Sequence, residues 1–312
     1  MTNGNKTKNI LICAGSGIGN VILQLPLLKK FESQGFHCDL LLRNVPHNTK
    51  EVLSLLLKSS KIEIFNINEI KRNKHYDIIY ETRSFNGGKD INYCCNSNLL
   101  ISSKDIFGVE EYDIFSETEY EFAALNKLIN LQYSKNDLAL TQNLSFSCSS
   151  RKIAIFTSGK KTNPAIKRNL PSIDWDVIID TLKIKNYEPV SIGFPNEYIN
   201  GCINKTSTNP IEFIDNIRQC QYFIGTDMGL IWLARSIGLN GSVFLGPTAI
   251  CKTKNSLLEN NILVFENKNV SCPIFPCWKQ RNIIQSKYKC NNSCIKSLVS
   301  TTNINKILES IK

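Results

Sequence analysis

Residues 9–20 read NILICAGSGIGN, and this stretch decides the fold that the sequence predicts. A short continuous apolar run that ends in glycines is typical of a parallel strand buried on both faces. Apolar residues then recur at helical spacing from Val21 to Phe31, and Gly35 predicts the end of that helix. A strand, a glycine-rich turn and a helix form one unit of an α/β fold with a parallel sheet.

The same alternation of apolar runs and helical patterns continues along the chain. Strands are predicted at residues 38–42, 62–65, 77–80, 152–156, 189–192, 222–225 and 242–245, and helices at residues 51–57, 173–183, 211–220 and 230–237. The polar stretch from Ser134 to Arg151 is the best candidate for a domain boundary. We therefore expect two Rossmann-like domains, residues 1–150 and residues 151–312, with ligand-binding loops at the carboxyl ends of their strands.

The length of 312 residues supports this division, because one domain usually has roughly 100 to 200 residues. No apolar stretch approaches the roughly 18 to 20 residues of a membrane span, and the apolar run near the N-terminus is too short for a secretory signal. We therefore expect a soluble, cytoplasmic protein whose 12 cysteines are mostly reduced.

Four late cysteines, Cys272, Cys277, Cys290 and Cys294, have a spacing that permits a tetrahedral thiolate metal site. The spacing is looser than that of paired CxxC motifs, which are the specific signal for such a site. We expect four ordinary thiols, and neither a metal ion nor another cofactor, with the four-cysteine metal site as the weaker alternative.

The net charge of +10 lies entirely in the second half of the chain, because residues 1–150 hold equal numbers of acidic and basic side chains. From Asn267 to Leu308 the sequence has no acidic residue but several lysines and one arginine. A surface of this kind attracts phosphate groups of nucleotides, anionic lipids or nucleic acids, although a solvated basic face explains it equally well.

The glycines after the first predicted strand invite a dinucleotide-binding interpretation. The fingerprint for that function needs a glycine where this chain has Asn20, and an acid after the second strand where this chain has Arg43. An NADP enzyme with Arg43 on the 2′-phosphate remains an alternative, as does a tight turn without a ligand. Gly17 and Gly19 would in either case let backbone N–H groups approach a ligand closely.

Three separated segments share their order and spacing with a known family. They are GIGNVILQLP at residues 17–26, KRNLP at residues 167–171 with Trp175, and GTDMGLIWLA at residues 225–234, which continues to FLGPT at residues 244–248. Together they resemble glycosyltransferase family 9, the ADP-heptose:lipopolysaccharide heptosyltransferase family. The third segment is the most specific, because it is similar to the family's Asp-Thr-Gly-Leu-x-His-Leu-Ala helix start.

This resemblance implies a GT-B fold, in which two Rossmann-like domains turn parallel sheets toward a central cleft. The N-terminal domain would bind the acceptor, and the last helix, residues 302–312, would return to it. The implied reaction is the transfer, with inversion, of a heptose-like sugar from an ADP-sugar to an anionic, lipopolysaccharide-type glycan or lipid-linked acceptor. The resemblance also implies a cytoplasmic protein with peripheral contact at the inner face of the membrane.

The residues expected to hold the donor follow successive predicted strands of the second domain. They are Thr157, Ser158, Lys167, Arg168, Glu197, Thr226, Asp227, Met228, Gly229 and Leu230. The first N–H groups of a helix have no partner within it, so those near residues 228–230 can bind a diphosphate. Lys167 or Arg168 would neutralise the leaving diphosphate, and Glu197 matches a family acid that contacts the nucleotide ribose.

Two residues depart from the family pattern. Asn20 stands where the family has an aspartate that acts as general base, and an amide cannot take up the acceptor's proton. Glu81 and Asp90, near the end of the strand at 77–80, are the candidate replacements, with Asn20 orienting the acceptor; weak activity or an easily activated acceptor are the alternatives. Trp232 replaces the motif's histidine, which leaves the donor sugar open.

Other functions also fit parts of the pattern. The chain could be a catalytically impaired relative that only binds nucleotide sugars or glycans, or a transferase that uses another nucleotide sugar or a protein acceptor. Nucleic-acid binding through residues 268–306 is disfavoured, because no recognised nucleic-acid motif accompanies the charge.

Overall fold

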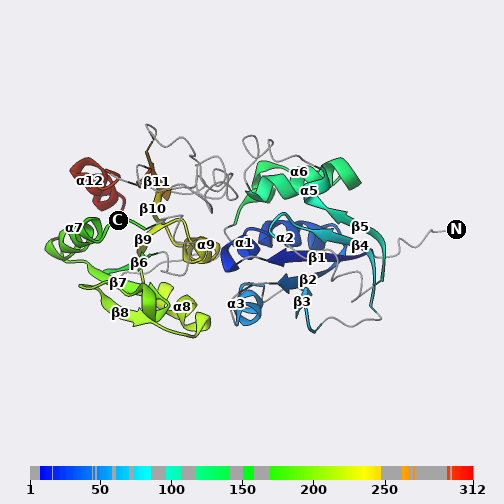
Figure 1. The fold of residues 1–312 in the computed structure, drawn as a ribbon, viewed down its shortest axis with the longest axis horizontal. Helices are drawn as coiled ribbons and strands as arrows, with labels where there is room; N and C mark the ends of the chain where they lie inside the picture. The colour runs from blue at the N-terminus through cyan, green and yellow to red at the C-terminus, as the bar shows by residue number, and fades with distance from the viewer. Residues whose placement is uncertain are drawn as a thin grey trace, which may run out of the picture. The chain divides into compact units, whose positions relative to one another are not determined.

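A computed structural model describes most of the chain, and Figure 1 shows its fold. The described residues are 8–15, 17–43, 45, 48–57, 61–69, 74–85, 96–106, 117–140, 150–157, 169–246, 262–267, 270, 294, 295 and 297–311. The chain divides into two compact units, Met1–Leu140 and Thr141–Lys312. The division at residue 150 that the sequence predicts lies just beyond residues 141–149, which are outside the described residues.

The first unit contains a five-stranded parallel sheet with the strand order β3-β2-β1-β4-β5. Its elements are β1 (Asn9–Gly15), α1 (Ile18–Ile22), α2 (Leu25–Ser33), β2 (His37–Arg43), α3 (Thr49–Leu56), β3 (Glu63–Asn66), β4 (His75–Glu81), β5 (Asn96–Ser102), α5 (Ser103–Ile106), α6 (Glu117–Ile129) and the 3-10 helix η2 (Lys135–Leu138). β1 lies at the centre of the sheet, and its buried apolar residues account for the run that opened the sequence.

The helix predicted from Val21 to Phe31 is wrong in one respect, because two helices occupy this stretch. α1 ends at Ile22, and α2 begins at Leu25 with Pro26 in its first turn. Proline fits the first turn of a helix but interrupts one that is already running, so Pro26 explains the break. β5 and α6 were not predicted, because their residues give no strong periodic signal.

The second unit contains a six-stranded parallel sheet with the order β11-β10-β9-β6-β7-β8. Its elements are β6 (Lys152–Phe156), α7 (Ser172–Ile184), β7 (Glu188–Gly193), the 3-10 helix η3 (Pro195–Glu197), β8 (Ile203–Thr206), α8 (Pro210–Ile217), β9 (Tyr222–Thr226), α9 (Gly229–Ser236), β10 (Gly241–Leu245), β11 (Ile262–Glu266) and α12 (Thr301–Ser310). The α/β class that the sequence predicts is therefore confirmed for both units.

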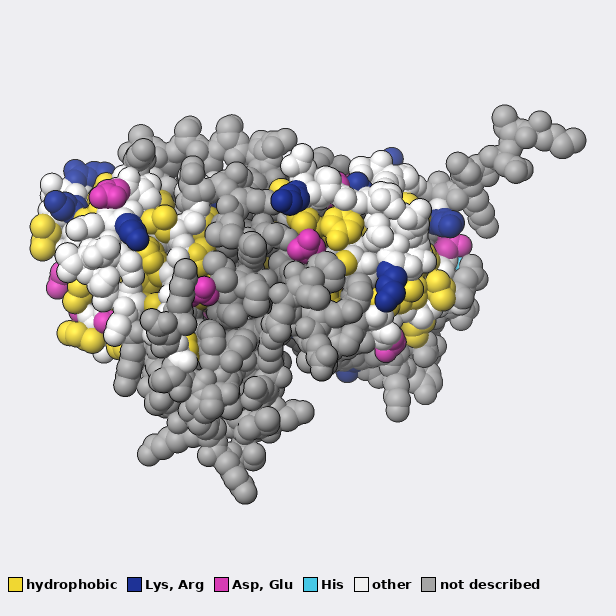
Figure 2. All heavy atoms as spheres, turned by 90° about the horizontal axis from the view of Figure 1, so that it is seen from above, with side chains coloured by type: hydrophobic (Ala, Val, Ile, Leu, Met, Phe, Trp, Pro, Cys, Tyr) yellow, Lys and Arg dark blue, Asp and Glu magenta, His cyan; other side chains and the backbone are white. Residues whose placement is uncertain are grey.

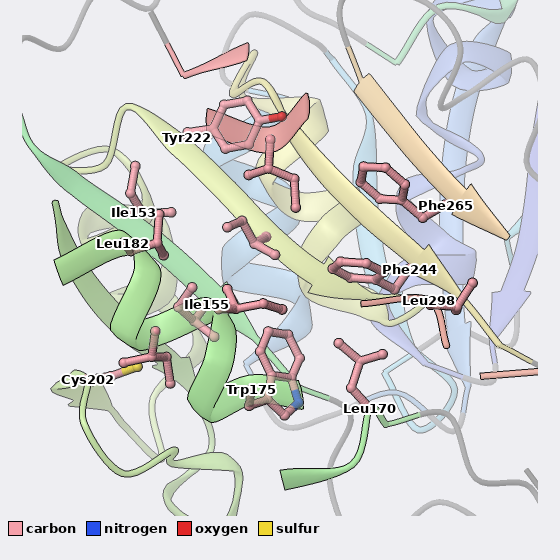
Figure 3. Close-up of a cluster of buried hydrophobic side chains, with 14 of the residues drawn as sticks. Ile153, Ile155, Leu170, Trp175, Leu182, Cys202, Tyr222, Phe244, Phe265 and Leu298 are labelled. Atoms are coloured by element: carbon pink, nitrogen blue, oxygen red, sulfur yellow. The ribbon is translucent and has the colours of Figure 1, made fainter. Parts of the chain in front are cut away.

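A cluster of buried side chains on one side of this sheet joins α7 and α12 to the strands (Figure 3). Trp175 of α7 is 4% exposed, and the rings of Phe244 and Phe265 stack with their centroids 5.1 Å apart. Ile307 of α12 is buried in the same cluster, and Ser310 shares a 2.6 Å hydrogen bond with the Tyr222 hydroxyl.

The last helix packs on the second unit, and the return to the first domain that the family resemblance implies stays a prediction. α12 belongs to the second unit and packs on that unit's core through Ile307. The amphipathic pattern of α12 explains the outcome, because its apolar residues find a complementary apolar surface beside α7 and β9.

Each sheet reverses its strand order at one place. In the first unit, β2 and β3 are added outward from β1 on one side, and β4 and β5 are then added on the other side of β1. In the second unit, β7 and β8 are added outward from β6, and β9, β10 and β11 are then added on the other side of β6. Ligands of open α/β sheets bind outside the carboxyl ends of the strands at this switch point. The loops after β1, β4, β6 and β9 are therefore the places where a functional site is expected.

Away from that edge, the first unit buries an acidic side chain. Asp39 is fully buried, and its Oδ2 accepts from the Tyr76 hydroxyl at 2.8 Å and pairs with Lys74 Nζ at 2.6 Å. Lys74 Nζ also lies 3.1 Å from Glu63 Oε2. Burial lowers the pKa of Lys74, but the hydrogen bonds and charges of Asp39 and Glu63 outweigh burial, so the pKa is raised.

Replacing Lys74 by methionine is expected to lower the free energy of unfolding of the first unit by about 1 to 3 kcal/mol, because buried Asp39 loses its cation. A raised lysine pKa stabilises the fold fully below the unfolded-state pKa of about 10.4, and this contribution disappears as the pH rises through the folded-state pKa. Urea unfolding from pH 7 to pH 11 should therefore show the wild type and Lys74→Met converging at high pH. Lys50→Met, which breaks an exposed pair with Glu69, is the control and should change little. A wild-type advantage that stays constant to pH 11 would contradict this account.

Candidate functional site

Three candidate residues meet at the switch point of the second sheet. The backbone pairing places Phe156 opposite Gly225, so Thr157 and Thr226 follow side by side at the carboxyl ends of β6 and β9. Thr157, Thr226 and Asp227 are 6%, 0% and 6% exposed. The fold thus brings together polar side chains that lie about seventy positions apart in the sequence, because Rossmann topology places the carboxyl ends of their strands side by side.

The start of α9 completes this edge. The helix begins at Gly229, and its N-cap residue, Met228, makes no side-chain cap hydrogen bond. By contrast, the Asn209 side chain accepts from Ile211 N–H at the start of α8. The first N–H groups of a helix lack partners within it and carry the positive end of the helix dipole. The N–H groups of Gly229 and Leu230 therefore suit an anionic ligand.

Gly225 allows α9 to begin this close to the strands. A Cβ atom at this position would lie 3.0 Å from Phe156 Cβ and 3.1 Å from Ile231 Cγ2, which is tighter than ordinary side-chain contact. A larger residue would push the first turn of α9 away from β6 and β9. The glycine in the sequence GTDMGL thus has a packing role that complements the predicted role of the residues after it.

The two threonines at this edge differ in their hydrogen bonds. The Thr157 hydroxyl donates to the backbone carbonyl of Glu197 at 3.0 Å. The Thr226 hydroxyl oxygen is buried and has no hydrogen-bond partner among the described residues. A buried hydroxyl without a partner is unfavourable, and such groups are often explained by a missing water or ligand.

Glu197, the expected ribose contact, takes part in the turn that follows β7. Its Oε2 accepts from the backbone N–H of Phe194 at 2.9 Å, which closes the 3-10 helix η3. Gly193 has a φ of 150°, and a Cβ atom there would overlap Glu197 Oε2. The carboxylate therefore shapes the loop beside Thr157, and its contact with a ribose stays a prediction.

Trp232, the second departure from the family pattern, is only 4% exposed. It lies within α9, between fully buried neighbours Ile231 and Leu233. Its indole is therefore largely part of the packed face of the helix. Stacking of this ring on a donor sugar, which the sequence left open, would need a change in the packing of α9.

In the first unit, the glycine loop follows β1 at the corresponding edge. Gly17 has a φ of 108°, which favours glycine, and it is the N-cap residue of α1. Gly19 is buried, and Asn20 follows it in α1, where the Asn20 carbonyl accepts from Gln24 Nε2 at 3.3 Å. The predicted acceptor-side glycines therefore lie in the turn and first helix after the central strand.

Glu81 ends β4, directly opposite Cys13 of β1 in the sheet register. Its side chain is 8% exposed. The next residue, Thr82, donates from its hydroxyl to the Cys13 carbonyl at 2.9 Å, and Ser84 Oγ accepts from Gly15 N–H at 3.3 Å. The loop after β4 thus lies against the end of β1, and Glu81 and the glycine loop share one edge.

Several predicted residues lie outside the described residues. They are Asp90, Ser158, Lys167, Arg168, Cys272, Cys277 and Cys290. Cys294 is described and is buried. Most of the basic residues between 267 and 308 are also outside, whereas Lys306 is described. Figure 2 shows one face of the molecule, on which some described Lys and Arg side chains lie close together at the left end and others stand singly. Among the residues that the structure describes, no helix is both long and apolar enough to cross a membrane.

Thr82 and Ser84 are polar groups of this edge that were not predicted from the sequence. Their position directly after a predicted strand was the available signal, because the loop after that strand belongs to the ligand-binding edge. Glu121 of α6, which also contacts this loop, gave no such signal, since α6 was not predicted.

Solved structures that resemble this chain include several glycosyltransferases. A glycosyltransferase family 9 protein from Veillonella parvula has a TM-score of 0.64 at 12% identity, with 97% of each chain covered. The dodecameric, iron-containing heptosyltransferase TibC of enterotoxigenic E. coli, solved with ADP-D-beta-D-heptose, has a TM-score of 0.67 at 16% identity, covering 98% of this chain and 77% of TibC. E. coli heptosyltransferase WaaC with ADP-2-deoxy-2-fluoro heptose has a TM-score of 0.62 at 11% identity, covering 96% of this chain and 99% of WaaC.

These structures share the α/β fold of this chain, and they include family 9, which the three sequence segments resemble. No family model and no curated protein matches the sequence. At these identities the comparison concerns the fold, so the chemistry must be argued from the residues.

The hydrogen bonds of the two threonines predict opposite effects on stability. Thr157→Val should lower the free energy of unfolding by about 1 kcal/mol, because it removes a hydrogen bond. Thr226→Val should leave that free energy unchanged or raise it, because it replaces a buried hydroxyl without a partner by a methyl group of similar shape. Urea unfolding of both variants measures the difference. A larger loss for Thr226→Val than for Thr157→Val would mean that the Thr226 hydroxyl is satisfied within the fold.

Proposed function

We propose that this protein is an inverting GT-B glycosyltransferase of family 9, which transfers a heptose-like sugar from an ADP-sugar to a lipopolysaccharide-type acceptor. The observation that carries the proposal is the coincidence of both sheet switch points with the family-like residues. Thr157, Thr226 and Asp227 lie at one of them, and the glycine loop and Glu81 lie at the other.

The second unit would hold the donor. The N–H groups at the start of α9 would bind the diphosphate, with the Thr226 hydroxyl as a further donor to it once the site is filled. Lys167 or Arg168 would neutralise the charge that develops on the leaving diphosphate. The ADP-sugar is favoured among nucleotide sugars because TibC and WaaC, which share this fold, were solved with ADP-heptose compounds.

The first unit would bind the acceptor and take up its proton. The acceptor hydroxyl oxygen attacks the anomeric carbon from the side opposite the diphosphate, and a new glycosidic C–O bond forms. The bond from that carbon to the diphosphate oxygen breaks, and ADP leaves with the electron pair. Direct displacement of this kind inverts the anomeric configuration.

Glu81 is the proposed general base among the described candidates. Its carboxylate can accept the hydroxyl proton, whereas the Asn20 amide cannot. General-base catalysis contributes about 10²- to 10⁴-fold, so an enzyme without any base would be slow. Asn20 is assigned the task of orienting the acceptor by hydrogen bonds. The binding-only relative becomes the better description if the protein binds ADP-sugars and transfers nothing.

The acceptor is proposed to be carried on an anionic lipid, because the positive charge of the second half of the chain would attract an anionic surface while the first unit binds the glycan. Each well-placed cation near an anionic lipid surface contributes about 1 kcal/mol of attraction. We infer that the protein transfers the sugar in the cytoplasm, at the inner face of the membrane, where a lipid-linked glycan acceptor is available.

Titration calorimetry with ADP, UDP and GDP tests the donor assignment. ADP should bind at least about tenfold more tightly than the other two, and Thr226→Val and Asp227→Ala should each weaken ADP binding by about tenfold or more, a change of about 1.4 kcal/mol. Asp215→Ala is the matched control, because Asp215 is an exposed acid on α8 of the same unit. Equal binding of all three nucleotides, or unchanged affinity in both site variants, would refute the donor assignment.

Removal of divalent cations is expected to leave the transfer rate unchanged. Helix N–H groups and a basic side chain would neutralise the diphosphate, so the reaction does not need Mg²⁺. The measurement is the initial rate of sugar transfer after dialysis against EDTA, with and without added Mg²⁺ or Fe²⁺, the latter because TibC contains iron. A loss of rate that either ion restores would contradict the expectation, and a dependence on iron would direct attention to the four late cysteines.

A further inference from the structure

Glu121 of α6 is a buried carboxylate that belongs to none of the predicted sites. It is 1% exposed. Its Oε2 accepts from the Tyr80 hydroxyl at 2.6 Å, and its Oε1 accepts from the backbone N–H of Arg83 at 2.8 Å. Both oxygens are therefore used, each by a donor from the end of β4 or the loop that follows it.

The two donors lie on either side of Glu81 in the sequence. Side chains of successive strand residues point to opposite faces of a sheet. Because the Tyr80 side chain reaches α6, the Glu81 side chain leaves the strand on the other face. Glu121 thus holds the Tyr80 side chain immediately before Glu81 and the Arg83 backbone N–H shortly after it, from the face opposite to the Glu81 carboxylate.

The same segment is fixed from its other side by β1. Both the backbone N–H and the hydroxyl of Thr82 donate to the Cys13 carbonyl, at 3.0 and 2.9 Å. Residues 80–84 are therefore held between the central strand and α6. The contacts from β1 set the distance to the glycine loop, and the contacts from Glu121 set how the end of β4 lies against α6.

α6 also reaches the connection between α1 and α2. The Thr118 hydroxyl, one turn before Glu121, donates to the Leu23 carbonyl at 3.1 Å. One face of a single helix thus contacts both segments that carry the candidate acceptor residues, namely the helix with Asn20 and the strand end with Glu81. The relative placement of these two segments depends on α6.

A carboxylate is suited to this task because its two oxygens can accept two strong hydrogen bonds at once. Bonds to an ionised acceptor are shorter and roughly twice as strong as those between neutral groups. Catalytic groups must be held within roughly 0.5 Å of their productive positions, which needs support from the residues behind them. An amide at this position keeps only one acceptor oxygen, and an apolar side chain keeps none.

We propose that Glu121 is a positioning residue that holds Glu81 in place for proton uptake from the acceptor. The inference rests on the proposed function, because it takes Glu81 to be the general base.

The test compares steady-state transfer by Glu121→Met, Glu121→Gln and Tyr80→Phe. Methionine keeps the size of the side chain but accepts neither bond, whereas glutamine keeps one acceptor oxygen. Glu121→Met should lower kcat by roughly 10- to 100-fold, as expected for a displaced catalytic group, and leave KM for the ADP-sugar unchanged. Glu121→Gln and Tyr80→Phe should show smaller losses in the same direction.

Tyr76→Phe is the matched control. Tyr76 is also a buried tyrosine of β4, and its hydroxyl donates to the Asp39 carboxylate at 2.8 Å, at the opposite end of the strand from Glu81. It should keep the wild-type kcat. Hydrogen exchange of the amides in residues 80–84 should become faster in Glu121→Met and Tyr80→Phe but not in Tyr76→Phe.

A double-mutant cycle separates positioning from general stability. If Glu121 acts through Glu81, Glu121→Met should cause no further loss of kcat in a Glu81→Gln background. The same fold-loss in both backgrounds, or wild-type kcat in both Glu121→Met and Tyr80→Phe, overturns the inference and leaves the transferase proposal intact. A wild-type protein that binds no ADP-sugar, or binds it without transfer, overturns the proposed function and the inference with it.

Discussion

Parallel strand pairing is the constraint on which the rest of this structure depends. In each unit every strand of the sheet runs in the same direction, so all the carboxyl ends meet at one edge. The strand order reverses once per sheet, and at that place two adjacent loops diverge to opposite faces and leave room for a ligand. Residues as distant as Thr157 and Asp227 become neighbours for this reason alone. The start of α9, whose first N–H groups have no partner within the helix, adds a local positive field to that edge.

Much of this arrangement is predictable from local sequence patterns. The apolar runs at 9–13, 152–156 and 222–225 mark central strands, and the glycines that follow them mark the turns at the switch points. The carboxylate of Glu81 could be placed at this edge because it directly follows such a run. Pro26 was a signal for a helix break that the apolar spacing alone does not give, because a proline fits the first turn of a helix and so separates α1 from α2.

The remaining features depend on contacts between distant segments, which periodicity does not report. α12 has the pattern of an amphipathic helix, but nothing in that pattern says which core will receive it, and it packs beside α7 and β9. Glu197 was identified by its match to a family acid, yet the 3-10 turn that uses one of its oxygens depends on the conformation of Gly193. Glu121 belongs to a helix with a weak pattern, and its partners lie 41 and 38 residues earlier in the chain.

The sequence separation between Glu121 and its partners affects how the first unit folds during synthesis. The last strand of its sheet ends at Ser102, whereas the helix that carries Glu121 begins only at Glu117. When β5 has just emerged from the ribosome, the nascent chain contains all the strands of this sheet. α6 has not yet emerged, so the end of β4 still lacks its hydrogen bonds to Glu121. Completion of the sheet and fixation of the segment with Glu81 are therefore separate events, and a chain truncated after β5 has the strands of the sheet without the contacts from Glu121.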